Sequence, residues 1–155
     1  MIALEAFYYK LKDFYNEFKT HKTMVLSTAS DDKVTSRTMS IVLINGIFYF
    51  QTDRNFEKCR QIENNPNVSL CIDNIQIEGI CREIGKPVDN SGFIKAYKNY
   101  FPNSYKMYSL LYAEVLYEIK PTLIKKWIYE NSFPYIEIFD LKNNVYKKTK
   151  YQVQD

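Results

Sequence analysis

The 155-residue chain contains very little histidine, cysteine and glycine. His21 is the one histidine, and the three cysteines, Cys59, Cys71 and Cys81, form no CxxC pair. Because structural zinc sites need about four Cys or His ligands at short spacings, this set argues against a metal centre. The odd number of cysteines instead predicts free thiols that pack as small apolar groups in a reducing compartment.

The motifs of several common enzyme classes are missing as well. The chain has neither GxGxxG nor GxxxxGK[ST], so it indicates neither a dinucleotide-binding fold nor a P-loop. A lone His21 in a polar segment offers no Ser/His/Asp triad. The carboxylates are scattered, and spacing alone selects no pair for acid–base work. The sequence therefore does not favour a hydrolase.

Long apolar runs are also lacking. No stretch approaches the length that spans a membrane, and the N-terminus shows no basic segment followed by an apolar run. We therefore expect a cytoplasmic protein. The net charge of +3 is small and spread along the chain, which does not by itself indicate nucleic-acid binding. Aromatic residues reach 16%, mostly tyrosine, which suits half-buried sheet faces and interfaces.

Short apolar segments separated by turn residues dominate the chain. The pattern predicts strands over 23–29, 34–44, 47–52, 68–72, 75–84, 110–119, 135–139 and 145–151. It predicts helices over 4–19, 55–65 with Asn55 as the cap, 88–100, and 122–131 after Pro121. About eight strands joined by tight turns are antiparallel and suit a closed barrel. We expect one domain over residues 1–155, mainly β with flanking helices.

The stretch from Ser36 to Ile62 should bring several polar and charged side chains to one place in the fold. The hairpin turn at Asn45-Gly46 folds two strands together, so Arg37 and Thr52 should meet at one end of the sheet. Lys58 lies one turn inside the helix that follows. Two cations, a hydroxyl and a helix N-terminus would converge there, which suits a phosphate. The alternative from composition alone is that Arg37 and Lys58 are ordinary surface cations.

The order of these pieces resembles the FMN-binding split-barrel superfamily of pyridoxamine 5′-phosphate oxidase. The matching pieces are MVLSTAS and a turn, SRTMSIVLINGIFYFQTD, the helix FEKCRQIENNP, and VSLCIDNIQIEGICREIG. The resemblance is closest to small members described as general stress or nitroimidazole-resistance-type proteins. It covers residues 23–84, with a looser match through the C-terminal half. It implies a split antiparallel β-barrel that binds FMN.

The resemblance also implies roles for individual residues. Arg37 and Lys58 would bind the FMN phosphate, helped by the hydroxyl and backbone of Thr52. The remaining implied cofactor-binding residues border the isoalloxazine ring or come from the partner of a homodimer, with one flavin in each of two interface clefts. They are Thr38, Met39, Ser40 and Gln51 beside the ring, and Asn74 or Gln76 from the partner.

Three departures separate the chain from the true oxidase. Glu57 stands where the oxidase has a basic residue before its helix lysine, and Val42 stands where it has another lysine. The C-terminal VYKKTKYQVQD lacks the substrate-binding arginine and histidine. We therefore predict an FMN-dependent oxidoreductase that uses a nicotinamide or other donor to reduce a small acceptor, and not a pyridoxamine phosphate oxidase.

Two other interpretations stay open at this stage. The first is a non-catalytic protein that binds flavin or a related small ligand, with deazaflavin F420 or haem as the other candidates. His21 gives little support to a haem site. The second is a small barrel, rich in aromatic residues and lysine, that binds single-stranded nucleic acid.

Overall fold

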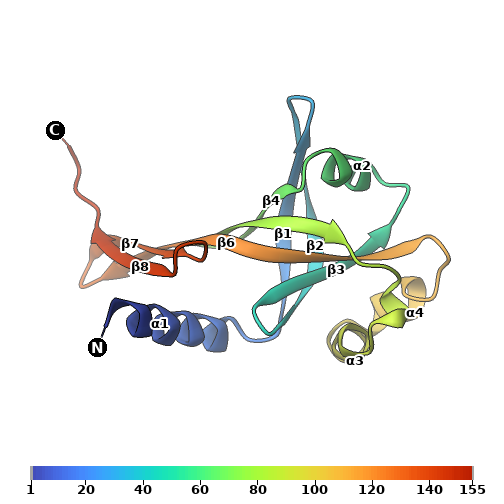
Figure 1. Cartoon of the computed structure of the whole chain (residues 1–155), viewed down its shortest axis with the longest axis horizontal. Coiled ribbons are helices and arrows are strands. Elements are labelled where there is room, and N and C mark those ends of the chain that lie inside the picture. Colours follow the sequence, from blue (N-terminus) through green and yellow to red (C-terminus); the bar gives the residue numbers. More distant parts are fainter. Residues whose placement is uncertain (1, 155) are drawn as a thin grey trace.

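Eight antiparallel strands in the order β3-β2-β1-β4-β5-β6-β7-β8 form one sheet in the computed structural model, which describes residues 2–154. β3 pairs with β6 as well, so the first six strands close into a barrel and β7 and β8 extend beyond it (Figure 1). The strands are β1 (His21–Ser30), β2 (Lys33–Ile44), β3 (Ile47–Asp53), β4 (Asn67–Ile72), β5 (Ile75–Glu83), β6 (Glu114–Glu130), β7 (Phe133–Asp140) and β8 (Val145–Lys150).

Within residues 2–154, four α-helices and one 3₁₀ turn flank this sheet. They are α1 (Ala3–Phe18), α2 (Glu57–Asn64), the 3₁₀ turn η1 (Pro87–Asp89), α3 (Ser91–Tyr100) and α4 (Pro102–Tyr108). α1 lies against the extension made by β7 and β8, whereas α2, α3 and α4 lie around the barrel (Figure 1). No helix within residues 2–154 is both long and apolar enough to cross a membrane.

The hairpin turn between β2 and β3 forms as predicted. Asn45 and Gly46 both have positive φ, 50° and 77°, the combination that matches the twist of a two-residue hairpin. The strands pair only from Val42–Tyr49 to Ile44–Ile47, and then separate as β3 turns to pair with β6. The separation leaves the far ends of β2 and β3 open to side chains from other elements.

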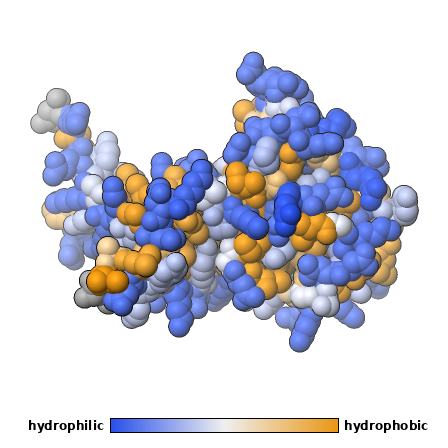
Figure 2. Space-filling model, viewed as in Figure 1, coloured by the Kyte–Doolittle hydropathy of each residue, from blue (hydrophilic) through white to orange (hydrophobic). Residues whose placement is uncertain are grey.

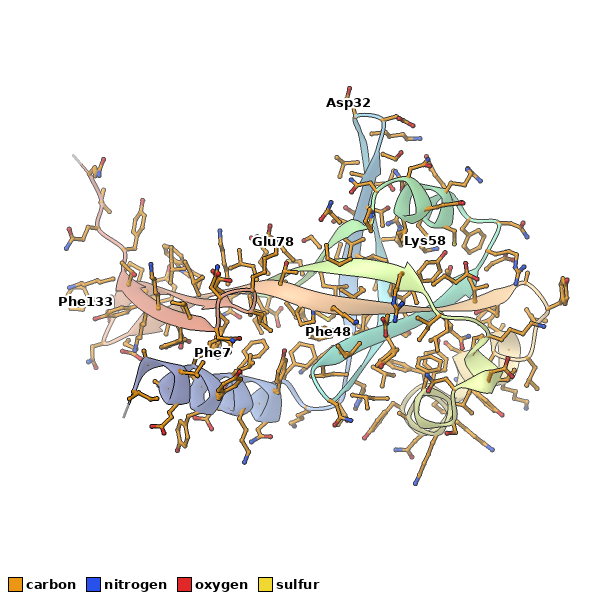
Figure 3. All side chains as sticks on the ribbon, in the orientation of Figure 1. Phe7, Asp32, Phe48, Lys58, Glu78 and Phe133 are labelled. Atoms are coloured by element: carbon orange, nitrogen blue, oxygen red, sulfur yellow. The ribbon has the colours of Figure 1, made fainter. Side chains whose placement is uncertain are left out.

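The core has two parts. Aromatic side chains of α1 pack on both the barrel and the extension: the ring of Phe18 lies 5.5 Å from that of Phe48 on β3, and the ring of Phe14 lies 5.6 Å from that of Phe139 on β7. α3 packs on the outside of the barrel through Phe93, which is fully buried. Figure 3 shows side chains filling the space between the ribbons, with Phe7 of α1 and Phe48 of β3 labelled. The space-filling view has a hollow between the extension and the barrel, with apolar and polar side chains mixed over both (Figure 2).

The predicted helix over 122–131 is wrong, because residues 122–130 are the second half of β6 and Asn131 is in the turn that follows. The strand pairs with β5 and β7, and its Leu123, Lys125 and Trp127 share one face. Pro121 stands at a register shift opposite Gly79, and a bulge is a place where a strand tolerates proline. Proline is common at the first position of a helix, but the β-branched and aromatic residues that follow Pro121 favour a strand.

Other boundaries also differ from the prediction. The helix expected from residue 88 begins at Ser91, where the side chain of Asn90 accepts a hydrogen bond of 2.9 Å from the backbone of Phe93. α4 was not predicted. The strand predicted over 110–119 begins only at Glu114, because residues 109–113 form a turn after α4. Asn55 does not cap α2: the cap position is Phe56, and the backbone N–H of Asn55 donates to Asp53.

Candidate functional site

A cleft of about 670 Å³ opens where the ends of β2 and β3 meet α2, with side chains of α3, α4 and the start of β6 completing its lining. Six predicted site residues line it together: Arg37, Thr38, Met39, Gln51, Thr52 and Lys58. The structure therefore brings together the two cations and the hydroxyl that the hairpin and helix pattern predicted. Figure 3 labels Lys58, which lies on the α2 side of the barrel.

Lys58 and Thr52 form a buried pair in the cleft. The Nζ atom of Lys58 donates a hydrogen bond of 2.9 Å to Oγ1 of Thr52, and both residues are buried. Burial lowers the pKa of Lys58, and the nearby Arg37 adds to this, while neighbouring acidic groups oppose it. The ammonium also lies 4.4 Å from the centre of the Phe56 ring, close enough for a cation–π interaction. Because Thr52 accepts from Lys58, its own hydroxyl hydrogen remains available to a ligand.

Arg37 is fixed from behind by a network on β1 and β2. Its guanidinium donates to Thr28 Oγ1 at 2.7 Å, to the carbonyl of Leu26 at 3.3 Å, and to Thr35 Oγ1. The hydroxyls of Thr28 and Thr35 in turn donate to Gln61 Oε1 of α2 at 2.6 and 2.7 Å. A guanidinium has five N–H donors, so the remaining ones can reach a ligand from an ordered position.

Glu57 also lines the cleft, and its charge is partly compensated. Its Oε1 accepts a hydrogen bond of 2.8 Å from Lys33, at the end of the β1–β2 hairpin. This bond and the charge of Lys33 lower the pKa of Glu57, so it is a carboxylate at neutral pH. A carboxylate at this position repels a bound phosphate. Pairing with Lys33 reduces that repulsion, although both side chains are largely exposed.

Sequence reasoning missed a buried polar chain at the base of the cleft. Ser109 donates to Gln51 Oε1 at 2.7 Å, and Gln51 Nε2 donates to Glu114 Oε2 at 2.9 Å. All three residues are at most 6% exposed. The pKa of Glu114 is raised to about 7, first by burial and then by the charge of Asp53, while Gln51 and Lys58 act in the opposite direction. Glu114 and Gln51 are 63 residues apart, so no local pattern could have linked them.

The rest of the lining is largely aromatic and apolar. Tyr97 of α3, Tyr108 of α4, Leu111 and Phe56 face the cleft together with Met39 of β2. A flat, partly apolar ligand that carries a phosphate would match both parts of such a cleft, because its ring could contact the aromatic wall while its phosphate met the cations.

The other three predicted site residues lie outside the lining of this cleft. Ser40 follows Met39 on β2 and pairs with Thr23 of β1. Asn74 is in the β4–β5 turn, where its side chain donates to the carbonyl of Trp127 at 2.6 Å. Gln76 pairs with Cys71 on β4. Asn74 and Gln76 were expected to act from a partner subunit, and that expectation stays a prediction.

His21 is enclosed by aromatic rings away from the cleft. Its ring stacks on Tyr100 at 4.1 Å and meets Phe101 edge-on. The Nδ1 atom is buried and has no hydrogen-bond partner within residues 2–154. Across the same residues, no group of three or more His, Cys, Asp or Glu side chains is arranged to hold a metal ion.

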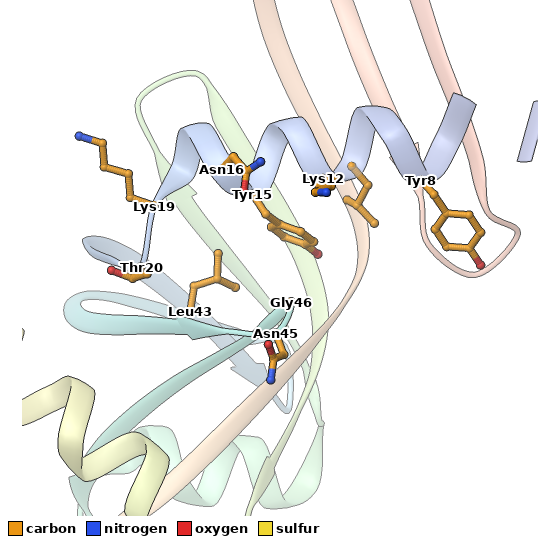
Figure 4. A pocket seen from close by; sticks show the side chains of 10 residues that line it. Tyr8, Lys12, Tyr15, Asn16, Lys19, Thr20, Leu43, Asn45 and Gly46 are labelled. Carbon is orange, nitrogen blue, oxygen red and sulfur yellow. The ribbon is translucent and has the colours of Figure 1, made fainter. Parts of the chain in front are cut away.

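A second, smaller pocket lies between α1 and the β2–β3 turn (Figure 4). It measures about 410 Å³, and its lining includes Tyr8, Tyr15, Leu43 and Gly46. Burial raises the pKa of Tyr15 to about 12, so its hydroxyl stays neutral. None of the nine predicted site residues is among those that line this pocket.

Comparison with known proteins agrees with the fold. The family described as Pyridoxamine 5′-phosphate oxidase matches residues 11–128. Among solved structures, the General Stress Protein 26 of Bacillus anthracis str. Sterne is 27% identical, with a TM-score of 0.58 over 74% of this chain and 91% of that one. No match was found among curated proteins.

Two more distant solved structures share the architecture alone. PhzG from Burkholderia lata 383, in complex with tetrahydrophenazine-1-carboxylic acid, is 14% identical with a TM-score of 0.63, over 96% of this chain and 91% of that one. A pyridoxamine 5′-phosphate oxidase-related, FMN binding protein from Nostoc punctiforme PCC 73102 is 12% identical with a TM-score of 0.58, over 84% and 86%.

Proposed function

The chain belongs to the pyridoxamine 5′-phosphate oxidase family, and on this premise we propose that it binds FMN in the cleft between β2, β3 and α2. The observation that carries the proposal is the convergence of Arg37, Thr52 and Lys58 in one partly buried cleft beside the start of α2. A dianionic phosphate can accept from both cations, from the hydroxyl and from backbone N–H groups at the helix start.

The two cations of the proposed phosphate site are already held in place before a ligand binds. Arg37 is held by Thr28 and Thr35, and Lys58 is held by Thr52, so neither side chain must be immobilised when the ligand binds. Each hydrogen bond between a charged group and the phosphate contributes about 1.5–3 kcal/mol. Two such cations give an affinity that depends strongly on the phosphate.

The ring of the proposed flavin would lie along the backbone of residues 38–40, beside Gln51. Met39 and Tyr97 offer apolar and aromatic surface on that side of the cleft. A bound flavin supplies the redox chemistry of a hydride or electron-pair transfer. The chain's own residues bind the phosphate, orient the ring and exclude water from its apolar face.

We further propose that two copies of the chain assemble, with Asn74 or Gln76 of each completing the cleft of the other. The strand register supports this, because Thr38, Val25, Cys71 and Gln76 form a row across neighbouring strands on one sheet face. Val25 and Cys71 are exposed on this face. Sedimentation should give about twice the 18.5 kDa of one chain.

The proposed activity is transfer of electrons from a reduced nicotinamide or another donor to a small acceptor. Glu57, paired with Lys33, differs from the basic residue of the true oxidase, and Val42 is fully buried in the core beside α3. These two positions do not support the substrate chemistry of pyridoxamine phosphate oxidation.

Ligand uptake tests this proposal against the two alternatives. The purified protein is mixed separately with FMN, F420, hemin and a single-stranded oligonucleotide, and binding is followed by absorbance and fluorescence. We expect FMN to bind at one per chain and the protein to turn yellow. Steady NADH or NADPH consumption with an added acceptor would then support turnover. Uptake of hemin or oligonucleotide with no uptake of FMN would overturn the proposal.

A further inference from the structure

Glu114 is a buried carboxylate of the cleft, and it is hydrogen-bonded to Gln51, which is proposed to lie beside the flavin ring. It is 5% exposed, and its Oε2 accepts a hydrogen bond of 2.9 Å from Gln51. The other end of the Gln51 amide accepts from Ser109 at 2.7 Å. Ser109 and Glu114 together therefore determine which way the amide of Gln51 points.

The charges around Glu114 oppose one another. Burial is the largest influence and favours the neutral carboxyl, and Asp53 of β3 acts in the same direction. Lys58 of α2 favours the carboxylate. The other charged or titratable groups that line the cleft are Arg37, Glu57, Tyr97 and Tyr108. Because the resulting pKa lies at about 7, a small change in nearby charge alters the protonation of Glu114 at neutral pH.

We propose that Glu114 is a positioning residue that takes up one proton when a phosphate-bearing ligand fills the cleft, and that it keeps Gln51 in place in this neutral form. Lys58 favours the carboxylate form of Glu114. A phosphate bound at Lys58 adds negative charge there, and this favours the neutral form of Glu114 instead. The proton comes from solvent, and no other covalent bond changes. The identity of the ligand as FMN rests on the proposed function, whereas the coupling needs only its phosphate.

The pH dependence of FMN affinity tests this coupling in the wild type and in Glu114→Gln. The amide oxygen of the variant can still accept from Gln51, but the side chain carries no charge. Above about pH 7, the wild type should lose up to about tenfold in affinity per pH unit, relative to the variant, until Glu114 ionises in the complex as well. Titration of the FMN phosphate near pH 6 affects both proteins alike and cancels in the ratio.

At pH 8.5 we expect Glu114→Gln to bind FMN about tenfold more tightly than the wild type, and at pH 6 about equally. Glu118→Gln is the matched control, because Glu118 is buried on the same strand but pairs with Arg82 outside the cleft. That variant should keep the wild-type pH profile. A constant affinity ratio between wild type and Glu114→Gln from pH 6 to 9 overturns the proposal.

A second measurement does not depend on the flavin. Carboxyl ¹³C NMR of glutamate-labelled protein follows the titration of Glu114 with and without inorganic phosphate. An upward shift in the pKa of Glu114 on adding phosphate supports the coupling, even for a protein that binds no FMN, in which case only the proposed function fails. An unchanged titration overturns the coupling, even for a protein that binds FMN tightly.

Discussion

Replacement of Lys58 by methionine isolates the charge of one phosphate ligand. Methionine keeps an unbranched apolar chain, which suits a position that is only 7% exposed. The change removes the Nζ atom that bonds to Thr52 and, in our account, to the phosphate. Loss of one charge-assisted hydrogen bond of about 1.5–3 kcal/mol should weaken FMN binding by roughly 10- to 150-fold.

Stability should respond differently from affinity. Burial lowers the pKa of Lys58, which means that the folded protein disfavours its charge. Removal of that charge offsets the loss of the hydrogen bond to Thr52, so the free energy of unfolding should change little. Titration of the apoprotein with FMN, followed by quenching of flavin fluorescence, measures the affinity. Lys106→Met, which removes a cation from α4 outside the cleft lining, is the matched control and should bind FMN as the wild type does. A folded Lys58→Met protein with wild-type affinity would refute the assignment of the phosphate to this cleft.

Three further substitutions probe the surroundings of the site. Lys33→Met leaves the Glu57 carboxylate unpaired, so FMN binding should weaken by about two- to fivefold at low salt and less at high salt, measured by the same titration. Thr28→Val removes a hydroxyl that holds Arg37, and a loss of about 2- to 10-fold in affinity is expected; an unchanged Kd would show that Arg37 needs no support. Gly79→Ala places a Cβ 2.6 Å from a methyl of Ile119 and 2.8 Å from the Lys120 carbonyl, so urea unfolding should show about 1–3 kcal/mol of destabilisation.

The part of the site that depends on local sequence could be predicted. Asn45-Gly46 specifies a two-residue turn, which brings the strands that carry Arg37 and Thr52 together. Lys58 follows from the start of the next helix, although that helix begins at Glu57 and is capped by Phe56 instead of Asn55. The general stress resemblance and the mainly β fold were likewise confirmed.

The part that depends on contacts across the barrel could not be predicted. Gln61 supports Arg37 through Thr28 and Thr35, and these positions come together only because α2 packs against β1 and β2. Glu114 reaches Gln51 because β6 pairs with β3, a pairing of strands more than 60 residues apart. The error over residues 122–131 has a related cause, since only the pairing partners β5 and β7 show why Pro121 does not begin a helix.

The central claim is that the cations of this cleft bind a flavin phosphate, and a comparison of FMN with riboflavin tests it most directly. The two ligands share the ring and differ in the phosphate, so the ratio of their dissociation constants for the same apoprotein measures the contribution of the phosphate to binding. We predict one FMN per chain and an affinity at least about 100-fold higher than that for riboflavin, with the difference lost in the Arg37→Ala, Lys58→Ala double variant. Equal affinity for FMN and riboflavin, or no binding of FMN, would contradict the account.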